Sequence, residues 1–365
     1  MKKNNNRIVL TGGHAGTTAI SIVEEIKKQN FIWEVHWIGP KKAIEGRSTS
    51  SLEHKYFNKL DISFHSIIFG KLQRKFSIWS VFSFLKIPVG FVQALYYLLT
   101  IKPKVVLSFG GFASFPVVVI SKMFNIPVII HEQTAVAGRA NLLSARFAKE
   151  VLLSRETSKN YFSKNNCHVV GNPILSQYFK DSEYKTKINR KTILIMGGSR
   201  GSQQINKIIK EILENLLDKY NVIHIAGELD YDEFYKLKSG FKKDRLQGYT
   251  LLKSVDPYEM LPVYNKADLV ISRAGANSVS ELIALGKPSI FIPIPWSYLN
   301  EQTKNAQFAS KYIPSIILDQ YTLTSNKLFL EIEKLFNIKE VKPKNNYLDK
   351  EASEKIVSLL SKYFK

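Results

Sequence analysis

Short apolar segments that end in glycine-rich or polar loops, each followed by a helical pattern, recur along the chain. Residues 7–10 are predicted to form a strand that leads into the turn 11–16, and a helix follows over residues 17–28. Strands that alternate with helices predict βαβ units and therefore parallel sheets. The ligand-binding loops of such sheets lie at the carboxyl ends of the strands, and the turn 11–16 falls at such an end.

The same succession begins again near residue 191. Residues 192–196 are predicted to be a strand, 197–202 a second glycine-rich turn and 205–217 a helix. At 365 residues the chain is longer than one hydrophobic core usually serves. We therefore predict an α/β protein of two Rossmann-like domains with parallel sheets, namely 1–172 and 191–347, joined by a polar linker at 173–190.

The glycine-rich turns are suited to binding an anion. Backbone N–H groups in such a turn can approach a phosphate closely, and the dipole of the following helix favours negative charge. A third helix is expected from Asn277, soon after Gly275. The P-loop motif GxxxxGK[ST] is absent, as is a regular GxGxxG motif. Two similar turns at equivalent places in two domains predict a cleft with phosphate on one wall.

Residues 272–306 give the strongest indication of a ligand. Glu281 follows Asn277 by one helical turn, where its carboxylate could accept hydrogen bonds from ribose hydroxyls. A glutamate on the helix surface is the simpler alternative. Together with the helix start, the segment suggests a pocket for a nucleoside diphosphate that carries a bulky group.

Metal chemistry has little support in the sequence. It contains no Cys/His spacing typical of zinc sites and no Asp-x-Asp pair in a loop, so we predict neither a metal nor another cofactor. The single cysteine, Cys167, excludes an internal disulfide and fits a reducing compartment. His14 stands within the first glycine-rich turn. It could pack or cap that turn, or it could act as a general base in the cleft.

The chain is strongly basic, with a formal net charge of +21. Such a charge concerns the partners of a protein more than its fold. No acidic residue lies between Asp61 and Glu132, a stretch that includes the apolar run 76–101. That run could be a transmembrane helix, buried core helices, or core helices with a patch at a membrane surface. Lys86 interrupts it near the middle, where a charge is costly inside a bilayer.

In the third interpretation, Trp79 and Phe82 insert into the membrane interface while Arg74 and Lys75 meet anionic head groups. Nucleic acid explains the charge less well, because no nucleic-acid-binding motif is present and the basic residues sit among apolar ones. The apolar run after the basic N-terminal residues is too short for a signal peptide. We therefore expect the protein to remain in the cytoplasm.

Several segments, in order and over most of the chain, match one known family. They are TGGH at 11–14, SFGGFASFP at 108–116, HEQTAVAGRANLLSARFA at 131–148, GNP at 171–173, MGGSRGSQQIN at 196–206 and the segment 272–306. By these segments the chain resembles the MurG family, the glycosyltransferases of peptidoglycan synthesis that add N-acetylglucosamine to a lipid-linked muramyl peptide.

The resemblance implies a GT-B fold, two Rossmann-like domains facing across a cleft, with a C-terminal helix within 348–365 packing back on the first domain. It implies UDP-N-acetylglucosamine as the donor and undecaprenyl-pyrophosphoryl-N-acetylmuramyl-peptide as the acceptor. The expected location is peripheral, at the cytoplasmic face of the cell membrane. The expected reaction is an inverting displacement by the muramyl 4-hydroxyl on the anomeric carbon, without a metal.

The resemblance also assigns residues. Glu281 would bind the ribose hydroxyls, Gln302 the sugar hydroxyls and the Val255 backbone the uracil, while Ser199 would bond the diphosphate or sugar region. His14 is the first candidate for the catalytic base and Glu132 the second. The substrate-binding residues would be Thr11, Gly12, Gly13, Thr134, Ser199, Val255, Ala276, Asn277, Ser278, Val279, Ser280, Glu281 and Gln302.

The sequence departs from the family pattern at four places. Val9 and Leu10 replace the leading glycines of the first turn, and residues 15–17 replace an aromatic residue and a proline. Thr134 stands where the family usually has Asn, and Leu175 stands where it often has Arg.

Two alternative functions remain: a UDP-N-acetylglucosamine 2-epimerase of the same fold, or a non-catalytic binder of the lipid precursor. The basic, acid-free segment argues against the epimerase.

Overall fold

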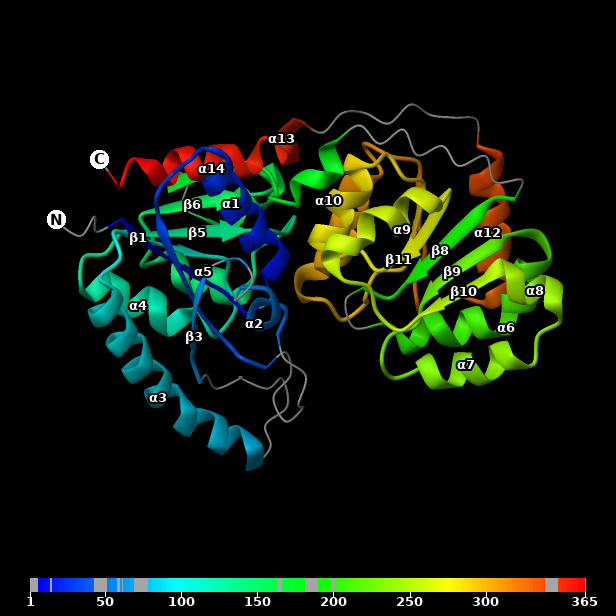
Figure 1. The fold of residues 1–365 in the computed structure, drawn as a ribbon, viewed down its shortest axis with the longest axis horizontal. Coiled ribbons are helices and arrows are strands. Elements are labelled where there is room, and N and C mark those ends of the chain that lie inside the picture. Colours follow the sequence, from blue (N-terminus) through cyan, green and yellow to red (C-terminus); the bar gives the residue numbers. More distant parts are fainter. Residues whose placement is uncertain are drawn as a thin grey trace. The chain divides into compact units, whose positions relative to one another are not determined.

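The computed structural model divides the chain into two compact units, Met1–Leu175 with Leu348–Lys365 and Ser176–Tyr347 (Figure 1). The predicted linker 173–190 is thus divided between the units after Leu175. The structure describes residues 6–13, 15–42, 51–57, 60, 62–68, 78–162, 166–180, 190–198, 201–338 and 347–364, without the side chains of 52, 78–85 and 347.

The first unit contains a parallel sheet of seven strands among its described residues, in the order β3-β2-β1-β4-β5-β6-β7. Ile8 of β1 pairs with Val35 of β2 on one side and with Val105 of β4 on the other. The central strands β4 and β5 are buried along their whole length, which is typical of parallel sheets covered on both faces. The strands are β1 (Arg7–Thr11), β2 (Glu34–Gly39), β3 (Ser63–Ser66), β4 (Val105–Ser108), β5 (Val128–Glu132), β6 (Glu150–Leu153) and β7 (Cys167–Val169).

One boundary that we predicted is wrong. The sequence pattern predicts a strand over residues 127–130 that ends at the polar residues His131, Glu132 and Gln133. The structure pairs His131 with Leu152 and Glu132 with Leu153, so β5 includes both residues. Their pairing with β6 depends on a neighbour distant in sequence, which the local pattern does not reveal.

Helices pack on this sheet through apolar residues spaced three or four apart. In α1 these are Ala19, Ile22, Val23 and Ile26. Pro116 stands in the first turn of α4, where its missing N–H costs nothing. The helices are α1 (Gly16–Lys28), α2 (Leu52–Phe57), α3 (Ile78–Ile101), α4 (Phe115–Met123), α5 (Arg139–Ala145), α13 (Tyr347–Lys350) and α14 (Ala352–Ser361), with the 3-10 helix η2 (Glu156–Tyr161).

The apolar run 76–101 forms α3 from Ile78 onward. Ala94, Leu98 and Ile101 on this helix are buried in the core of the first unit, where α3 packs against α4. Within the part of the chain that the structure describes, no helix has the length and apolarity that crossing a membrane requires.

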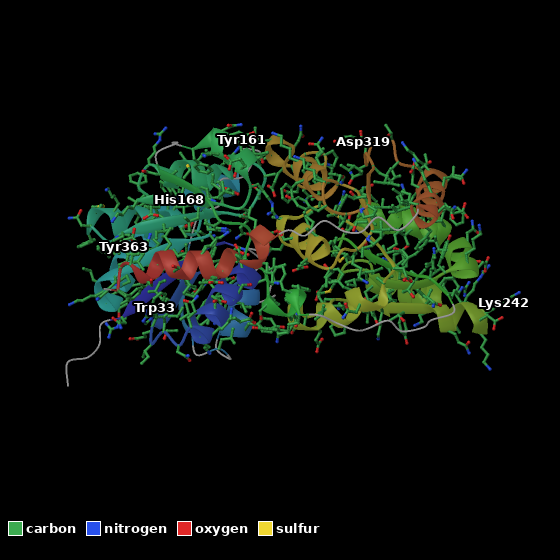
Figure 2. All side chains as sticks on the ribbon, turned by 90° about the horizontal axis from the view of Figure 1, so that it is seen from above. Trp33, Tyr161, His168, Lys242, Asp319 and Tyr363 are labelled. Atoms are coloured by element: carbon green, nitrogen blue, oxygen red, sulfur yellow. The ribbon has the colours of Figure 1, made fainter. Side chains whose placement is uncertain are left out.

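The C-terminal helix α14 belongs to the first unit and packs against α1 (Figure 1). Beyond the end of α14, the Phe364 ring stacks on Trp33 with ring centroids 4.2 Å apart, and the Tyr363 hydroxyl donates to Glu150. Trp33 and Tyr363 are labelled near this end of the helix in Figure 2.

A buried ion pair fixes the segment that precedes α14. Arg155 Nη1 and Nη2 lie 2.5 and 2.8 Å from Asp349 Oδ1 and Oδ2. Asp349 Oδ1 also accepts a hydrogen bond from the Asn172 backbone N–H at 2.8 Å. The carboxylate therefore ties together three segments of the first unit that are far apart in the sequence.

The second unit contains a parallel sheet of six strands, counted over its described residues, in the order β10-β9-β8-β11-β12-β13. These are β8 (Thr192–Met196), β9 (Asn221–Ile225), β10 (Tyr249–Leu252), β11 (Leu269–Ser272), β12 (Ser289–Phe291) and β13 (Ser315–Ile317). The helices are α6 (Gln203–Lys219), α7 (Tyr231–Ser239), α8 (Lys243–Gly248), α9 (Met260–Lys266), α10 (Ala276–Ala284), α11 (Glu301–Ala309) and α12 (Ser325–Asn337), with the 3-10 helices η4 (Ser176–Phe179), η5 (Pro257–Glu259) and η6 (Tyr298–Asn300).

We predict that Asp349→Ala lowers the free energy of unfolding of the first unit by about 3 kcal/mol, because Arg155 would stay buried without its counterion. Urea denaturation followed by the fluorescence of Trp33 and Trp37 measures this. The exposed Glu354→Ala on α14 is the matched control and should change stability by less than about 0.5 kcal/mol. Equal effects of the two substitutions would contradict the structural role of the ion pair.

Candidate functional site

The glycine-rich turn after β8 needs its glycines for backbone geometry. Gly198 and Gly201 have φ angles of +85° and +76°, which other residues rarely adopt. A Cβ atom on Gly197 would lie 2.1 Å from the Ser202 nitrogen, whereas one on Gly198 would meet nothing within 4 Å. The backbone is therefore tightly packed at Gly197 and open at Gly198.

Ser202 begins α6 and links this turn to the loop after β11. Its Oγ accepts a hydrogen bond from the Ile205 N–H, as an N-cap residue does. The same Oγ accepts from Nη2 of Arg273 at 2.8 Å. The start of α6 is thus fixed by a cation from a neighbouring strand.

Arg273 is a functional candidate that our sequence analysis missed. The residue is 6% exposed, and its guanidinium donates to the carbonyls of Ile292 and Pro293 and to Gln320 Oε1. Burial lowers the pKa of Arg273 to about 10, so the group stays charged at neutral pH. No carboxylate pairs with it among the described residues. The position of a basic residue directly after a buried strand was the signal available in the sequence.

A hollow of about 400 Å³ lies at the carboxyl ends of β8, β9, β11 and β12. Two large apolar side chains at its rim, Leu229 and Trp296, are exposed. The inner wall holds the Arg273 cation, while the Asp230 carboxylate there already accepts hydrogen bonds from Gln203 and Asn206. The cation and the apolar rim suit an anion that carries a larger group. The lining residues are Gly197, Gly201, Ser202, Gln203, Gln204, Ala226, Leu229, Asp230, Arg273, Ile294 and Trp296.

The start of α10 forms a second anion-compatible position on the same sheet edge. Gly275 is its N-cap residue, and a Cβ atom there would meet nothing within 4 Å. Ala276, Asn277 and Ser278 are half-buried, while Val279 and Ser280 are buried. The predicted phosphate contacts at this helix start are therefore ones that backbone N–H groups would make, aided by the helix dipole.

Glu281 is a buried carboxylate and does not lie on an exposed helix surface. It is 9% exposed, and its Oε2 accepts a hydrogen bond from the Tyr264 hydroxyl at 2.9 Å. Burial raises the pKa of Glu281 to about 7, and the bond from Tyr264 opposes this rise. The side chain therefore titrates near neutral pH, which is frequent for residues in functional sites.

Gln302 lies in the first turn of α11. Its Oε1 accepts from the Ile294 backbone N–H at 3.0 Å, so its NH₂ group is the end that can donate to a ligand. Asn305, one turn later, donates to the Ala274 carbonyl and ties α11 to the loop before α10. Val255 is half-buried in the loop between β10 and η5.

In the first unit, residues 11–13 pack against a second glycine-rich loop. The Thr11 hydroxyl donates to the Ile38 carbonyl, and the Gly13 N–H donates to the Gly110 carbonyl at 2.9 Å. A Cβ atom on Gly12 would lie 3.2 Å from the Trp37 ring. The backbone, and not the Thr11 side chain, is therefore the part of this loop that can meet a ligand.

Glu132 organises the loop between β5 and α5. Its carboxylate accepts hydrogen bonds from Thr134 N–H and Oγ1, from Gly138 N–H and from Asn141 Nδ2, at 2.8 to 3.1 Å. The Thr134 hydroxyl also lies 2.7 Å from the Val136 carbonyl. Both predicted residues are thus engaged within the loop, and Asn141 links them to Gly110, against which it packs.

Some of the predicted residues cannot be placed. His14, Ser199, Arg74 and Lys75 lie outside the described residues, as do the side chains of Trp79 and Phe82 on α3. In the part of the chain that the structure describes, no three His, Cys, Asp or Glu side chains are grouped as metal ligands.

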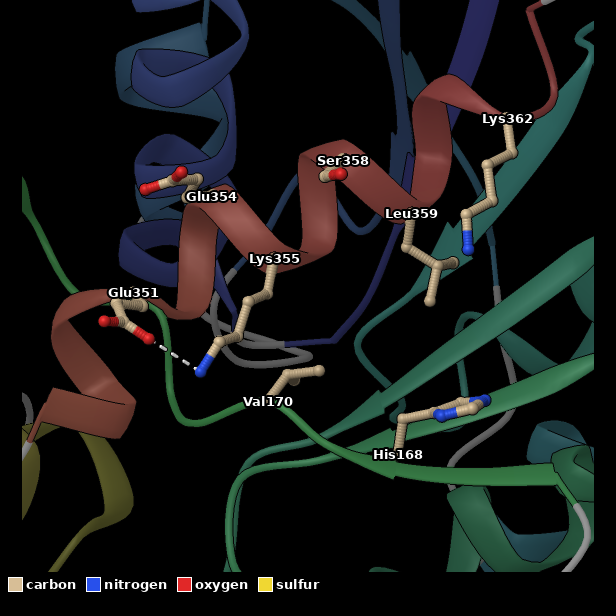
Figure 3. Close-up of a pocket in the computed structure, with 8 residues that line it drawn as sticks. All are labelled: His168, Val170, Glu351, Glu354, Lys355, Ser358, Leu359 and Lys362. Carbon is tan, nitrogen blue, oxygen red and sulfur yellow. Dashed lines mark ion pairs between the residues drawn. The ribbon is translucent and has the colours of Figure 1, made fainter.

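Another hollow, of about 580 Å³, lies in the first unit between α14 and β7 (Figure 3). Lys355 of its lining is paired with Glu351 at 2.8 Å, and His168 and Lys362 lie at its other side (Figure 3). Its lining carries charges of both signs, and none of its residues belongs to the glycine-rich turns 11–16 and 197–202. We assign it no ligand.

Two family models match the chain. The glycosyltransferase family 28 N-terminal domain matches residues 8–153, and the glycosyltransferase family 28 C-terminal domain matches residues 192–360. With its two parallel α/β units and its anion-compatible loops, the chain is a hexosyltransferase of family 28 with the GT-B fold. The predicted fold class is thereby confirmed.

Curated relatives identify the family more narrowly. The UDP-N-acetylglucosamine–N-acetylmuramyl-(pentapeptide) pyrophosphoryl-undecaprenol N-acetylglucosamine transferase of Clostridium novyi (strain NT) is 32% identical over 98% of this chain and 99% of its own length. The enzyme of that name from Legionella pneumophila (strain Corby) is 34% identical over 97% of this chain and 96% of its own length. The chain belongs to the MurG family.

Solved structures support the fold. The crystal structure of Acinetobacter baumannii MurG matches with a TM-score of 0.67 and 23% identity, covering 98% of this chain and 99% of that one. A UDP-GlcNAc 2-epimerase from Neisseria meningitidis bound to UDP-GlcNAc also has a TM-score of 0.67, at 15% identity, covering 98% and 100%. The epimerase likeness concerns the fold alone, whereas the sequence relatives carry the transferase name.

We predict that Glu281→Gln stabilises the ligand-free protein at pH 8 but much less at pH 5. The native state holds the Glu281 proton up to about pH 7 and the unfolded state only to about 4.5, so wild-type stability falls as pH rises between these values. Glutamine removes this loss, worth up to about 3 kcal/mol, and its carbonyl can still accept from Tyr264. Urea unfolding at both pH values measures it, and a gain independent of pH would contradict it.

Proposed function

We propose that the protein transfers N-acetylglucosamine from UDP-N-acetylglucosamine to the 4-hydroxyl of the undecaprenyl-pyrophosphoryl-linked N-acetylmuramyl peptide, the step from lipid I to lipid II. The observation that carries the proposal is the set of groups on one sheet edge of the second unit. Gly198, Gly275, Arg273 and Glu281 there combine two helix starts, a buried cation and a carboxylate that titrates near neutral pH. This set suits a nucleoside diphosphate sugar.

In this proposal Glu281 accepts hydrogen bonds from the ribose hydroxyls and Gln302 donates to the sugar. The backbone of Ala276 to Ser280 and the turn containing Ser199 bind the diphosphate, and the Val255 backbone meets the uracil. The relatives' names support UDP-N-acetylglucosamine as the donor, and the burial of Glu281 beside a hydroxyl donor supports its role in recognising hydroxyl groups.

The reaction is an inverting displacement. The acceptor 4-oxygen forms a bond to the anomeric carbon while the bond to the diphosphate oxygen breaks, and its electron pair leaves with UDP. Arg273 and the starts of α6 and α10 stabilise the leaving anion, since preorganised positive ends are strongest where charge develops. The chemistry requires neither a metal nor a cofactor.

A base must accept the proton of the 4-hydroxyl. We propose His14 for this role, because it follows the loop formed by Thr11, Gly12 and Gly13 in the unit that would hold the acceptor. Glu132 is the weaker candidate, since its carboxylate already accepts four hydrogen bonds within its own loop. Thr134 is engaged in that loop as well, so we propose that both order it for the acceptor.

We further propose that the protein binds an anionic membrane surface at the cytoplasmic face of the cell membrane, by α3. Val89, Val92, Tyr96 and Leu99 are exposed and follow one another at helical spacing, so they form one apolar stripe. In the sequence, this stripe follows the predicted patch of Arg74, Lys75, Trp79 and Phe82, and both lie in the acid-free, basic stretch. Nucleic acid has no part in the proposal.

We predict UDP release from UDP-N-acetylglucosamine only when a short-chain lipid-linked muramyl peptide is present. Glu281→Ala should raise the donor KM by about 10- to 100-fold, because the variant loses the hydrogen bonds that a charged carboxylate accepts from two ribose hydroxyls. Glu211→Ala, an exposed position on α6, is the control and should leave KM unchanged. Epimerised UDP-sugar without acceptor would indicate the isomerase instead, and binding without turnover would indicate a precursor-binding protein.

We also predict that replacing Val92 and Tyr96 with Ser lowers binding to phosphatidylglycerol vesicles by about tenfold, because two apolar side chains no longer leave water. Co-sedimentation measures this, and donor binding should be unaffected. The matched control replaces Tyr321 and Leu330, which are equally exposed on the second unit. A similar loss in both variants, or none in the first, would refute the membrane role of α3.

A further inference from the structure

Tyr264 on α9 holds the carboxylate of Glu281, although no sequence motif points to it. The tyrosine is 1% exposed, and its hydroxyl donates to Glu281 Oε2 at 2.9 Å. Its oxygen also shares a hydrogen bond with the Ser278 side chain, and Met196 Sδ, a weak acceptor, lies 3.8 Å away. In the bond to Glu281 the tyrosine donates its proton to a carboxyl group, and a hydrogen bond to a charged acceptor is stronger than one between neutral groups.

The Tyr264 ring is fixed by its surroundings. Tyr178 of η4 packs edge-on against it, with ring centroids 6.1 Å apart and an interplanar angle of 64°. The Tyr178 hydroxyl lies 3.5 Å from the Pro257 carbonyl and does not bond Glu281. Burial raises the pKa of Tyr264 well above its ordinary value, so its hydroxyl remains a donor throughout the working range of pH.

The bond from Tyr264 gives the two carboxylate oxygens of Glu281 different roles. Tyr264 occupies Oε2, which leaves Oε1 to meet a ligand. A bond from a neutral donor also stabilises the charged form of the carboxyl group against burial, and the charged form is the one that accepts from two hydroxyls. A side chain locked in this way loses little rotamer freedom when the ligand binds.

We propose that Tyr264 is a positioning residue for nucleotide recognition, because its hydroxyl orients Glu281 toward the ribose hydroxyls of the donor. The inference rests on the proposed role of Glu281 in binding ribose. Tyr264 touches no substrate in this account and acts only through the carboxylate.

The effect has a pH signature. The titratable groups that act on Glu281 from the elements packed against it are Tyr264 on α9 and Tyr178 on η4, and burial keeps both protonated at neutral pH. The preference for UDP over 2′-deoxy-UDP should therefore grow as pH rises from about 6 to 8, where Glu281 itself ionises, because the phosphates of the two nucleotides titrate alike. Without the Tyr264 hydroxyl, that rise should move to higher pH.

The test compares UDP with 2′-deoxy-UDP by calorimetry, between pH 6 and 9, for the wild type and Tyr264→Phe. We expect the wild type to bind UDP more tightly than 2′-deoxy-UDP. In Tyr264→Phe the ratio of the two affinities should fall about tenfold, and the pH at which the preference for UDP grows should rise. Tyr178→Phe removes a neighbouring hydroxyl that does not bond Glu281. It is the matched control and should keep both the preference for UDP and its dependence on pH. A merely structural role of Tyr264 would weaken both nucleotides equally.

Glu281→Gln separates the two possible failures. If this variant loses the preference for UDP but Tyr264→Phe keeps it, the positioning role is overturned while the ribose assignment stands. If Glu281→Gln keeps the preference, the ribose assignment is wrong and the positioning role falls with it. Tyr264→Met, which also lacks the hydroxyl, must repeat the result, so that a folding defect of one variant cannot decide the outcome.

Discussion

One buried guanidinium holds together the ligand-facing edge of the second unit. Arg273 follows β11 and bonds Ser202 after β8, the carbonyls of Ile292 and Pro293 after β12, and Gln320 after β13. These four strands are neighbours in the sheet, so a single cation fixes the loops of all of them. Because its partners are neutral groups, the charge is left to act on whatever anion binds there. The start of α6, the hollow beside it and the proposed stabilisation of UDP all depend on this arrangement.

The first unit reaches a comparable order with carboxylates instead of a cation. Glu132 gathers backbone and side-chain donors of its own loop, and Asp349 gathers Arg155 and the Asn172 N–H. In both units, then, a buried charge is satisfied by several donors or acceptors from separate segments, which makes each loop rigid. A transferase benefits from such rigidity, because an orientation held in advance lowers the cost of bringing two substrates into line.

The sequence allowed the architecture to be predicted but only part of the site. Strands, glycine-rich turns and helix starts leave local patterns, and β1, β8 and the start of α10 agree with them to within a residue. The family match selected Glu281, but its burial and its hydroxyl partner could not be foreseen. Tyr264 and Arg273 were missed, because each works through residues that tertiary folding brings near and that no spacing rule connects. Glu132 was placed in a loop because its pairing with β6 is likewise non-local.

The route of the chain through Asp349 has a consequence for its synthesis. The second unit is one continuous segment, whereas the first unit is completed only by residues that follow it. As the nascent chain leaves the ribosome, Arg155 is translated long before its counterion, and the surface that α14 covers on α1 stays open until α14 itself has been made. The first unit, most of which is synthesised first, is therefore the last to be completed. Until then its exposed apolar surface can aggregate or bind a chaperone.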